Sequence, residues 1–460
     1  MKTYQDLLQV PENDDARMDF VRQCINMHKN TALYREALIA EDYDAFRNRT
    51  ITEFQKLLYT VSGTAVPDNY SANYKIPSRF FNRFITQENQ YLLGNGVTWQ
   101  KKDTKDKLGT DTLPFDTQLQ KLGKYALIAG VSFGFFNLDH VEAFQLKEFV
   151  PLYDEENGSL SAGIRFWQID SEKPLRATLY EMDGYTEYIW RKNKGEILRP
   201  KRAYKQKFRY TEADGYEIYA GMNYPSFPIV PLWGNTHHQS ELIGLREGID
   251  CYDLIKSGYA NNVDEGSLIY WTITNAGGMD DVDLAQFVQR MKTLHAQNFD
   301  DAIQVDSHSV EVPYASREAM LSRLEKDLYK DAMALNTEEI ASGAVTATQI
   351  RASYEPLNAK TDDYEYCVHE FIRGILSIAG VQDEASFTRS MLVNATEEIQ
   401  SIVQAAQFLE PEYVTRKIIT LLGDGDKADD ILRQMDADDY ERMNVEEETP
   451  EETAEDDLNE

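Results

Sequence analysis

Residues 340–350 read "IASGAVTATQI" and separate two helical patterns, so this stretch decides how the chain is organised around it. Upstream, residues 316–340 carry leucine and alanine at spacings of three and four, which predicts one helix. Downstream, residues 346–379 carry a near-heptad apolar stripe. Pro356 lies inside that stripe and predicts a kink, because proline removes a backbone hydrogen bond. On the residues alone, the small residues between the helices are typical of a helical hairpin with a glycine C-cap.

A further helix is predicted before this pair, over residues 240–266, with Ser240 as its N-cap. Between this helix and the helix at 316–340, the pattern changes to a strand-like "SLIYWTIT", a short helix near 283–294 and a strand-like "AIQVDSHSVEVP". We therefore expect a small α/β insertion over residues 267–313.

The N-terminal half combines helices with a sheet. Its first hundred residues favour helices; one face is formed by Phe54, Leu57, Leu58 and Val61, and a later helix stops at Gly94. From about 131 to 229, strand-like runs are separated by three Asx-Gly pairs, at 157–158, 183–184 and 214–215. Such pairs tolerate the positive φ angles of tight hairpins, so we expect an antiparallel meander. Its aromatic residues are predicted to pack in the core: Tyr180, Tyr185, Tyr188 and Trp190.

The C-terminal end divides in two. Residues 384–435 are predicted to form two or three short helices. Residues 436–460 are strongly acidic, with Arg442 as the one basic residue, and are expected to be disordered and self-repelling.

Composition limits the classes of partner. The 460 residues carry a formal charge of -31, from 78 acidic and 47 basic residues, so most of the surface should repel nucleic acid and anionic lipid. Contact with DNA must then be local. The cysteines, Cys24, Cys251 and Cys367, give neither a disulfide framework nor a metal pair. The N-terminus lacks a signal-peptide pattern, and the longest apolar run, near 125–138, is shorter than the roughly 20 residues that span a bilayer. We expect synthesis in the cytoplasm and no membrane partner.

Motifs for catalysis are missing from the sequence. There is no phosphate loop and no GxSxG elbow, and "GNGVTW" lacks the preceding strand of a dinucleotide site. "GDGDKADD" fails the ligand pattern of a calcium loop, and His237 and His238 are expected in an exposed turn. We therefore expect no catalytic residue, metal or cofactor. The alternative that stays open is a hydrolase using a carboxylate pair that no motif marks.

Four stretches, in this order, resemble the portal proteins of tailed phages, of the type found in siphophages of Gram-positive hosts. They are "SRFFNRFITQENQYLLGNGVTW"; "YALIAGVSFGFFNLD" with "FQLKEFVPLYDEENGSLSAGIRFW"; "FPIVPLWGNTHHQSELIGLREGIDCYDLIKSGYANNVDEG"; and "SGAVTATQIRASYEPLNAKTDDYEY". The resemblance covers residues 59–379 and implies an α+β portal fold. It implies these parts: a helical and β wing at 1–235, stem helices at 236–266 and 314–341, an α/β clip at 267–313, a tunnel loop at 342–346, a long kinked wing helix at 347–379, a helical crown at 380–435 and the acidic tail at 436–460.

The resemblance also implies where DNA and partners touch the chain. The tunnel loop, Ser342, Gly343, Ala344, Val345 and Thr346, would project into a central channel, where small uncharged residues suit sliding DNA. Basic rings on the channel wall would come from Arg323, Lys326 and Lys330. The equal alternative is that these cations pair with Glu325 and Asp327. Docking residues on the clip would include Tyr270, Trp271, Asp280 and Asp281.

The function that the resemblance implies is structural. Portal proteins form a ring, dodecameric in the virion, at one capsid vertex, through which double-stranded DNA is packaged and ejected. Implied partners are other copies of the chain, the terminase large subunit, a head-completion or head–tail connector protein, and the major capsid and scaffold proteins. Another phage head or connector component is the alternative within the structural class.

Overall fold

The structure is a computed structural model of the 460-residue chain. It describes residues 2–390, apart from gaps at 12, 61, 70, 102, 193, 206–207, 212–214, 219–220, 267–269, 275–279, 295–303, 309–313 and 339–346, and also residues 402–421, 428 and 431–435. The chain divides into two compact units. The first comprises residues 1–336 and 356–390, and the second comprises 337–355 and 391–460. Helices and strands are mixed throughout, so the expected α+β class is confirmed.

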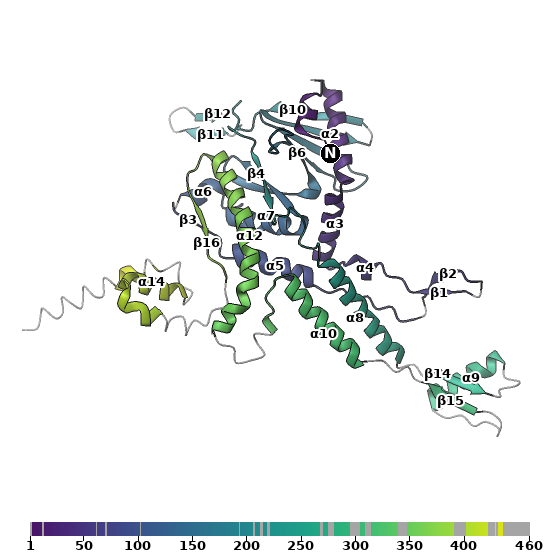
Figure 1. Ribbon diagram of the computed structural model, residues 1–460. Helices are drawn as coiled ribbons and strands as arrows, with labels where there is room; N and C mark the ends of the chain where they lie inside the picture. The colour runs from purple at the N-terminus through teal and green to yellow at the C-terminus, as the bar shows by residue number, and fades with distance from the viewer. Residues whose placement is uncertain are drawn as a thin grey trace, which may run out of the picture. The chain divides into compact units, whose positions relative to one another are not determined.

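An antiparallel meander forms the larger sheet of the first unit (Figure 1). Its strands pair in chain order: β6 (Phe149–Tyr153), β7 (Leu160–Trp167), β8 (Leu175–Glu181), β9 (Gly184–Arg191) and β10 (Lys194–Arg202). Two of the predicted Asx-Gly turns lie at hairpins, where Gly158 has φ 71° and Gly184 has φ 139°. The third turn includes Asp214, outside the described residues, between the paired strands β11 (Phe208–Thr211) and β12 (Gly215–Ile218). The aromatic residues predicted for the core are buried or half-buried there.

A three-stranded sheet is built from strands on both sides of the meander in the chain, in the order β13 (Ile229–Trp233), β4 (Val131–Asn137) and β5 (His140–Gln145). The helix α7 (Phe115–Ala129) packs against it and ends at Gly130, whose φ of 87° suits the helix-to-strand turn. The helix α12 (Ala347–Ala379) also meets this sheet: a Cβ atom on Gly134 would lie 2.5 Å from the Phe371 ring. Glycine at 134 therefore permits a close helix-to-strand contact.

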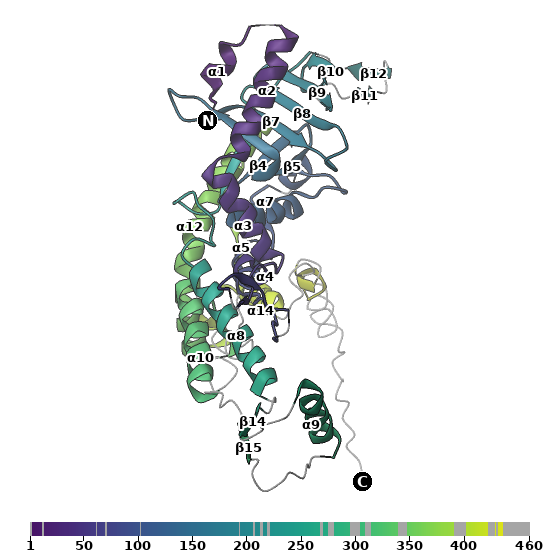
Figure 2. The ribbon, with the colours of Figure 1, turned by 90° about the vertical axis from the view of Figure 1, so that its right-hand side faces the viewer.

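The remaining N-terminal helices pack on these sheets or on other helices. They are α1 (Tyr4–Leu8), α2 (Asp14–Lys29), α3 (Ala32–Asp44), α4 (Arg49–Thr52), α5 (Phe80–Leu93) and α6 (Thr104–Leu108). The helix α2 lies against the meander (Figure 2). Its residues Val21, Cys24 and Ile25 join the core of the meander, and Arg17 forms a 3.0 Å ion pair with Glu181 of β8.

The predicted order of helix, α/β insertion, helix is present. α8 (Arg246–Gly266) comes before β14 (Tyr270–Thr274), α9 (Asp281–Leu294) and β15 (Gln304–His308), and α10 (Tyr314–Asp331) follows. The strands β14 and β15 are antiparallel, from Tyr270 opposite His308 to Thr274 opposite Gln304. Pro356 lies within α12, and the boundary between the two compact units falls immediately before it.

The helix predicted around Phe54 is wrong. In its place the structure has a hairpin of β1 (Leu57–Tyr59) and β2 (Ala65–Pro67), with all of its strand residues exposed. Gly63, with φ 79°, makes the turn, and the Thr60 hydroxyl accepts a hydrogen bond from the Thr64 amide. Helical spacing misled because Phe54, Leu57 and Leu58 are at least 40% exposed, so the described residues place no core against this stripe to stabilise a helix. Val61, the fourth residue of the predicted stripe, lies outside the described residues.

Two predicted helix ends also differ. The helix after Ser240 begins only at Arg246, because the Ser240 hydroxyl accepts from the Leu242 amide in a turn and Gly244 has φ 87°. The returning helix ends at Asp331 rather than near 340. Beyond that end, the Gln87 side chain of α5 forms two hydrogen bonds with the Leu335 backbone. Leu335 is therefore buried although it lies outside the helix.

The segment after α12 also departs from the short helices predicted from residue 384. β16 (Ala385–Phe387) pairs with β3 (Val97–Trp99), and Arg389 forms a 2.6 Å ion pair with Glu365 of α12. Residues 380–390 therefore belong to the first unit. In the second unit the structure describes η2 (Ala406–Phe408) and α14 (Pro411–Leu421). The predicted acidic tail lies outside the described residues.

Candidate functional site

The helices α8 and α10 form an antiparallel pair in the first unit (Figure 1 and Figure 2). Near one end Gly248 admits Leu328, since a Cβ atom at position 248 would lie 2.9 Å from the leucine Cδ2. Near the other end the rings of Tyr259 and Tyr314 meet edge to face at 5.8 Å. These two contacts fix the direction and register of the pair.

The predicted wall cations all lie on exposed positions of α10. Arg323 pairs with Asp327 of the next helical turn at 3.6 Å, in agreement with the pairing alternative for this residue. Such an exposed pair contributes only about 0.3–0.5 kcal/mol. Lys326 and Lys330 are exposed and form no ion pair with any residue that the structure describes.

The other predicted site residues lie in and around the insertion. Ser342 to Thr346 fall outside the described residues. Tyr270 and Trp271 are in β14, and Asp281 is the first residue of α9. Asp280 is the N-cap of α9: its carboxylate accepts from the amides of Val282 and Asp283, both at 2.9 Å. Asp280 and Asp283 form the reciprocal capping pattern that the spacing D-x-x-D signals.

A buried polar stripe on α8 is the feature that sequence reasoning missed. Asp253, Ser257 and Asn261 follow one another every four residues and are all buried. Their side-chain oxygens accept hydrogen bonds from alternate backbone amides of an extended segment: Ser78 at 2.8 Å, Ile76 at 3.0 Å and Tyr74 at 2.6 Å. The helix thus holds residues 74–78 by side chains in place of a neighbouring strand. The signal was a polar residue at every fourth position on an otherwise amphipathic helix.

Neighbouring residues complete this joint between α8 and the N-terminal helices. Asn48 donates to the Asp253 carboxylate at 2.5 Å and to the Ser78 carbonyl at 3.2 Å. One turn earlier on α8, Asp250 accepts from the hydroxyls of Tyr43 and, at 2.7 Å, of Thr50. Burial raises the pKa of Asp253, and the hydrogen bonds from Asn48 and Ser78 oppose that rise.

A buried ion cluster joins three elements of the first unit. The Lys360 ammonium of α12 lies 2.7 Å from a carboxylate oxygen of Glu88 on α5 and 2.7 Å from one of Glu241, in the turn before α8. Asn235 donates to the other Glu241 oxygen at 2.7 Å. Burial raises the pKa of Glu88 to about 7, while the charge of Lys360 opposes the rise. The two carboxylates hold the pKa of Lys360 above its ordinary value. The cluster lines a hollow of about 320 Å³.

Over residues 20–440 the sequence matches the family described as phage portal protein, SPP1 Gp6-like. The chain belongs to this family. The family membership expected from the sequence is therefore confirmed, and with it the assignment to a structural component of phages.

Two portal proteins illustrate the relationship. The portal protein of Clostridium phage phiCD119 is 24% identical over 287 residues, which cover 59% of this chain and 61% of that protein. The portal protein of Bacillus phage SPP1 is 22% identical over 387 residues, covering 77% of this chain and 74% of that protein. The chain thus spans about three-fifths of the phiCD119 protein and three-quarters of the SPP1 protein.

Among solved structures, the chain is similar to the neck of an empty gene transfer agent particle, with a TM-score of 0.44 and 11% identity. That match covers 75% of this chain and 90% of the solved chain. The virion of a native gene transfer agent gives a TM-score of 0.43 and 12% identity, with 74% and 89% of the two chains covered.

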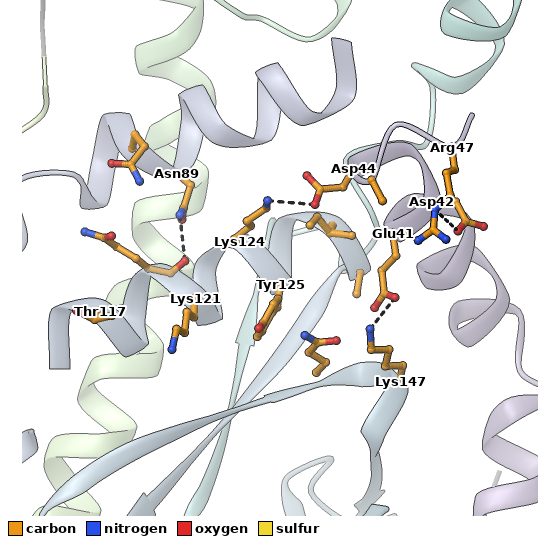
Figure 3. Close-up of a pocket in the computed structure, with 16 residues that line it drawn as sticks. Glu41, Asp42, Asp44, Arg47, Asn89, Thr117, Lys121, Lys124, Tyr125 and Lys147 are labelled. Atoms are coloured by element: carbon orange, nitrogen blue, oxygen red, sulfur yellow. Dashed lines mark hydrogen bonds and ion pairs between the residues drawn. The ribbon is translucent and has the colours of Figure 1, made fainter. Parts of the chain in front are cut away.

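A second hollow, of about 590 Å³, lies between α3 and α7 (Figure 3). Its charges pair across the hollow: Lys147 with Glu41 at 2.9 Å, and Lys124 with Asp44 at 3.1 Å. Within the described ranges no group of three or more His, Cys, Asp or Glu side chains is placed to hold a metal ion. In those same ranges no helix has the length and apolar content that crossing a bilayer requires.

Proposed function

We propose that the chain forms a closed ring with a central channel at one vertex of a phage capsid, and that double-stranded DNA passes through this channel during packaging and ejection. The observation that carries the proposal is the family match over residues 20–440. The antiparallel α8 and α10 pair, with a strand–helix–strand insertion between them, supports it. The protein has no catalytic activity of its own in this proposal, and a terminase supplies the energy of packaging.

The proposed parts follow the expected order, with one change. The wing comprises residues 1–235 and 347–379, the stem comprises 236–266 and 314–341, and the clip comprises 267–313, with a tunnel loop at 342–346. The crown begins after residue 390 and not at 380, because β16 pairs with β3 of the wing. The clip, with Tyr270, Trp271, Asp280 and Asp281, docks the terminase large subunit and later a head-completion or connector protein. The major capsid and scaffold proteins surround the ring.

Charge supports passage of DNA in preference to tight binding. Each copy carries a net charge of -31, and the candidate cations on α10 are few. Affinity for duplex DNA rises steeply with each phosphate that a lysine or arginine neutralises. A ring with scattered Lys326 and Lys330 side chains and an uncharged loop at 342–346 therefore lets DNA slide.

Native mass spectrometry of the purified chain, combined with negative-stain class averages, tests the ring. We expect a closed ring with one central channel. The measured mass gives the number of copies in the ring in solution, and in the virion we expect twelve. A monomer or dimer that is unchanged by protein concentration and salt would contradict the proposal.

Deleting residues 342–346 tests the tunnel loop. We expect rings to assemble in normal yield but the amount of DNA packaged per capsid to fall severalfold, because the loop lines the narrowest part of the channel in this proposal. A five-residue Gly-Ser replacement is the control for chain length and should retain packaging better than the deletion. Loss of ring assembly on deletion would refute the loop assignment.

A further inference from the structure

An exposed apolar hairpin leaves the first unit between α4 and α5. We call residues 54–74 the arm; its strands are β1 and β2, and Figure 1 shows the hairpin projecting beyond the helices at its base. Six of its apolar side chains are exposed: Phe54, Leu57, Leu58, Tyr59, Val66 and Tyr74. Tyr59 is 74% exposed and Leu57 is 52% exposed. Among the described strands, neither β1 nor β2 pairs with a third strand. An isolated two-stranded hairpin is marginally stable in water, so we expect another protein surface to pack against this one.

The base of the arm is held rigidly. The three α8 side chains Asp253, Ser257 and Asn261 fix the backbone of residues 74–78, where the arm ends. At its start, the Lys75 ammonium donates to the Thr52 carbonyl at 2.7 Å. The Asp68 amide donates to the Lys56 carbonyl at 2.9 Å and closes the hairpin. A fixed base presents the tip in one place, which lowers the entropy lost when the tip binds.

Charge identifies the partner. The arm contains one lysine, Lys56, and one aspartate, Asp68, so its net charge is zero in a chain whose net charge is -31. Copies of so acidic a chain repel one another wherever their acidic surfaces approach. Contact between copies is therefore favoured at surfaces that are apolar and uncharged, which is what the arm offers. A projecting arm that fits a different surface on the next copy is a head-to-tail contact, and contacts of that kind generate rings where the rotation between copies closes.

We propose that the arm of each copy packs against the neighbouring copy in the ring and that this contact buries Leu57, Tyr59 and Val66. The inference rests on the ring of the proposed function and adds the segment that links its subunits. It also explains why α8 carries a buried polar stripe: the stem helix sets the direction of the arm.

Excision of the hairpin tests the contact. Because Lys56 and Asp68 are hydrogen-bonded to each other, residues 57–67 can be replaced by a two-residue Asn-Gly turn without moving the base. We expect the protein concentration at which half of the chains are in rings to rise at least about tenfold, since the apolar contact is lost. The circular dichroism spectrum should be unchanged except for the hairpin.

A point variant and a matched control separate the arm from general surface hydrophobicity. The double variant Leu57→Ser with Tyr59→Ser should also raise the protein concentration at which half of the chains are in rings. Trp167→Ser with Ile169→Ser, at 39% and 88% exposed positions near the end of β7, should leave it unchanged. A photo-crosslinking amino acid at position 59 should give cross-links to a second copy of the chain.

The outcomes are distinct. Wild-type rings, with arm variants that assemble at the wild-type concentration, would overturn the arm contact alone. Cross-links from position 59 only within one chain, or only to a different protein, would also overturn it. A wild-type chain that stays monomeric under all conditions would overturn both the ring and the arm contact.

Discussion

Replacement of Lys360 by methionine is expected to lower the free energy of unfolding by about 3–5 kcal/mol near neutral pH. The methionine keeps most of the side-chain volume but removes the ammonium that lies 2.7 Å from both Glu88 and Glu241. Glu88 is only 2% exposed, so its carboxylate would be left in the interior without a cation. Uncompensated buried charge is among the few causes of destabilisation this large.

The loss should grow as the pH rises. Burial raises the pKa of Glu88 from 4.5 to about 7 in the folded chain. A carboxyl with a higher pKa in the folded state costs stability as pH rises between its unfolded and folded pKa values, by about 1.4 kcal/mol per pH unit. In the wild type this cost in stability stops growing when the pH reaches the folded pKa of Glu88. Without Lys360, whose charge lowers the pKa of Glu88, the folded pKa moves higher, because burial and then the charges of Glu241 and Asp363 still raise it. The cost therefore continues to grow at alkaline pH.

Urea unfolding followed by tryptophan fluorescence, at a fixed protein concentration and from about pH 6 to about pH 9, measures this difference. Glu88→Gln in the Lys360→Met background should remove this added pH dependence of the free energy of unfolding, since no buried carboxyl then titrates at position 88. Lys124→Met breaks the more exposed pair with Asp44 and should cost no more than about 1 kcal/mol. A Lys360 variant as stable as the Lys124 variant at every pH would show that the cluster does not hold the three elements together.

Elements whose signals are local could be predicted from the sequence. The Asx-Gly turns of the meander at Gly158 and Gly184 depend on residues next to one another, because positive φ is a property of a single position. The strand–helix–strand insertion was also predicted in order. The family membership rested on the order of several such stretches, each weak alone.

Features that depend on contacts between distant parts could not be predicted. Phe54, Leu57 and Leu58 fit helical spacing, yet they form a hairpin because the first unit places no core beside them. Lys360 looks like the polar face of an amphipathic helix, and only the packing of α5 and the turn at 241 reveals that it is buried. The same holds for Asp253, whose partners at 48 and 78 lie before and after the arm in the sequence.

Asp253→Ala is the second substitution with a large expected effect. Asp253 is fully buried and accepts from the Ser78 amide at 2.8 Å and the Asn48 side chain at 2.5 Å. Its removal leaves two buried donors short of an acceptor, and each unpaired donor costs about 1–3 kcal/mol. We expect a loss of about 2–5 kcal/mol, measured by the same urea unfolding, together with increased hydrogen exchange at residues 74–78.

Asp253→Asn separates the hydrogen bonds from the charge. Its side-chain oxygen can still accept from the Ser78 amide, and its new amino group faces Asn48, whose own oxygen is buried without a partner among the described residues. Rotation of the Asn48 amide would pair the two groups, so the asparagine variant should lose much less stability than the alanine variant. Because burial raises the pKa of Asp253, ionisation of this carboxyl costs stability as the pH rises from its unfolded to its folded pKa, and the asparagine variant should lack that dependence.

The alanine and asparagine variants also connect stability to assembly. Glu247→Ala, at an exposed carboxylate of the same helix, is the control and should change neither unfolding nor ring formation. If the α8 stripe directs the arm, Asp253→Ala should weaken ring formation along with the protection of residues 74–78, while Asp253→Asn should preserve both. Equal losses in the alanine and asparagine variants would mean that the charge of Asp253, and not its two hydrogen bonds, is what the joint requires.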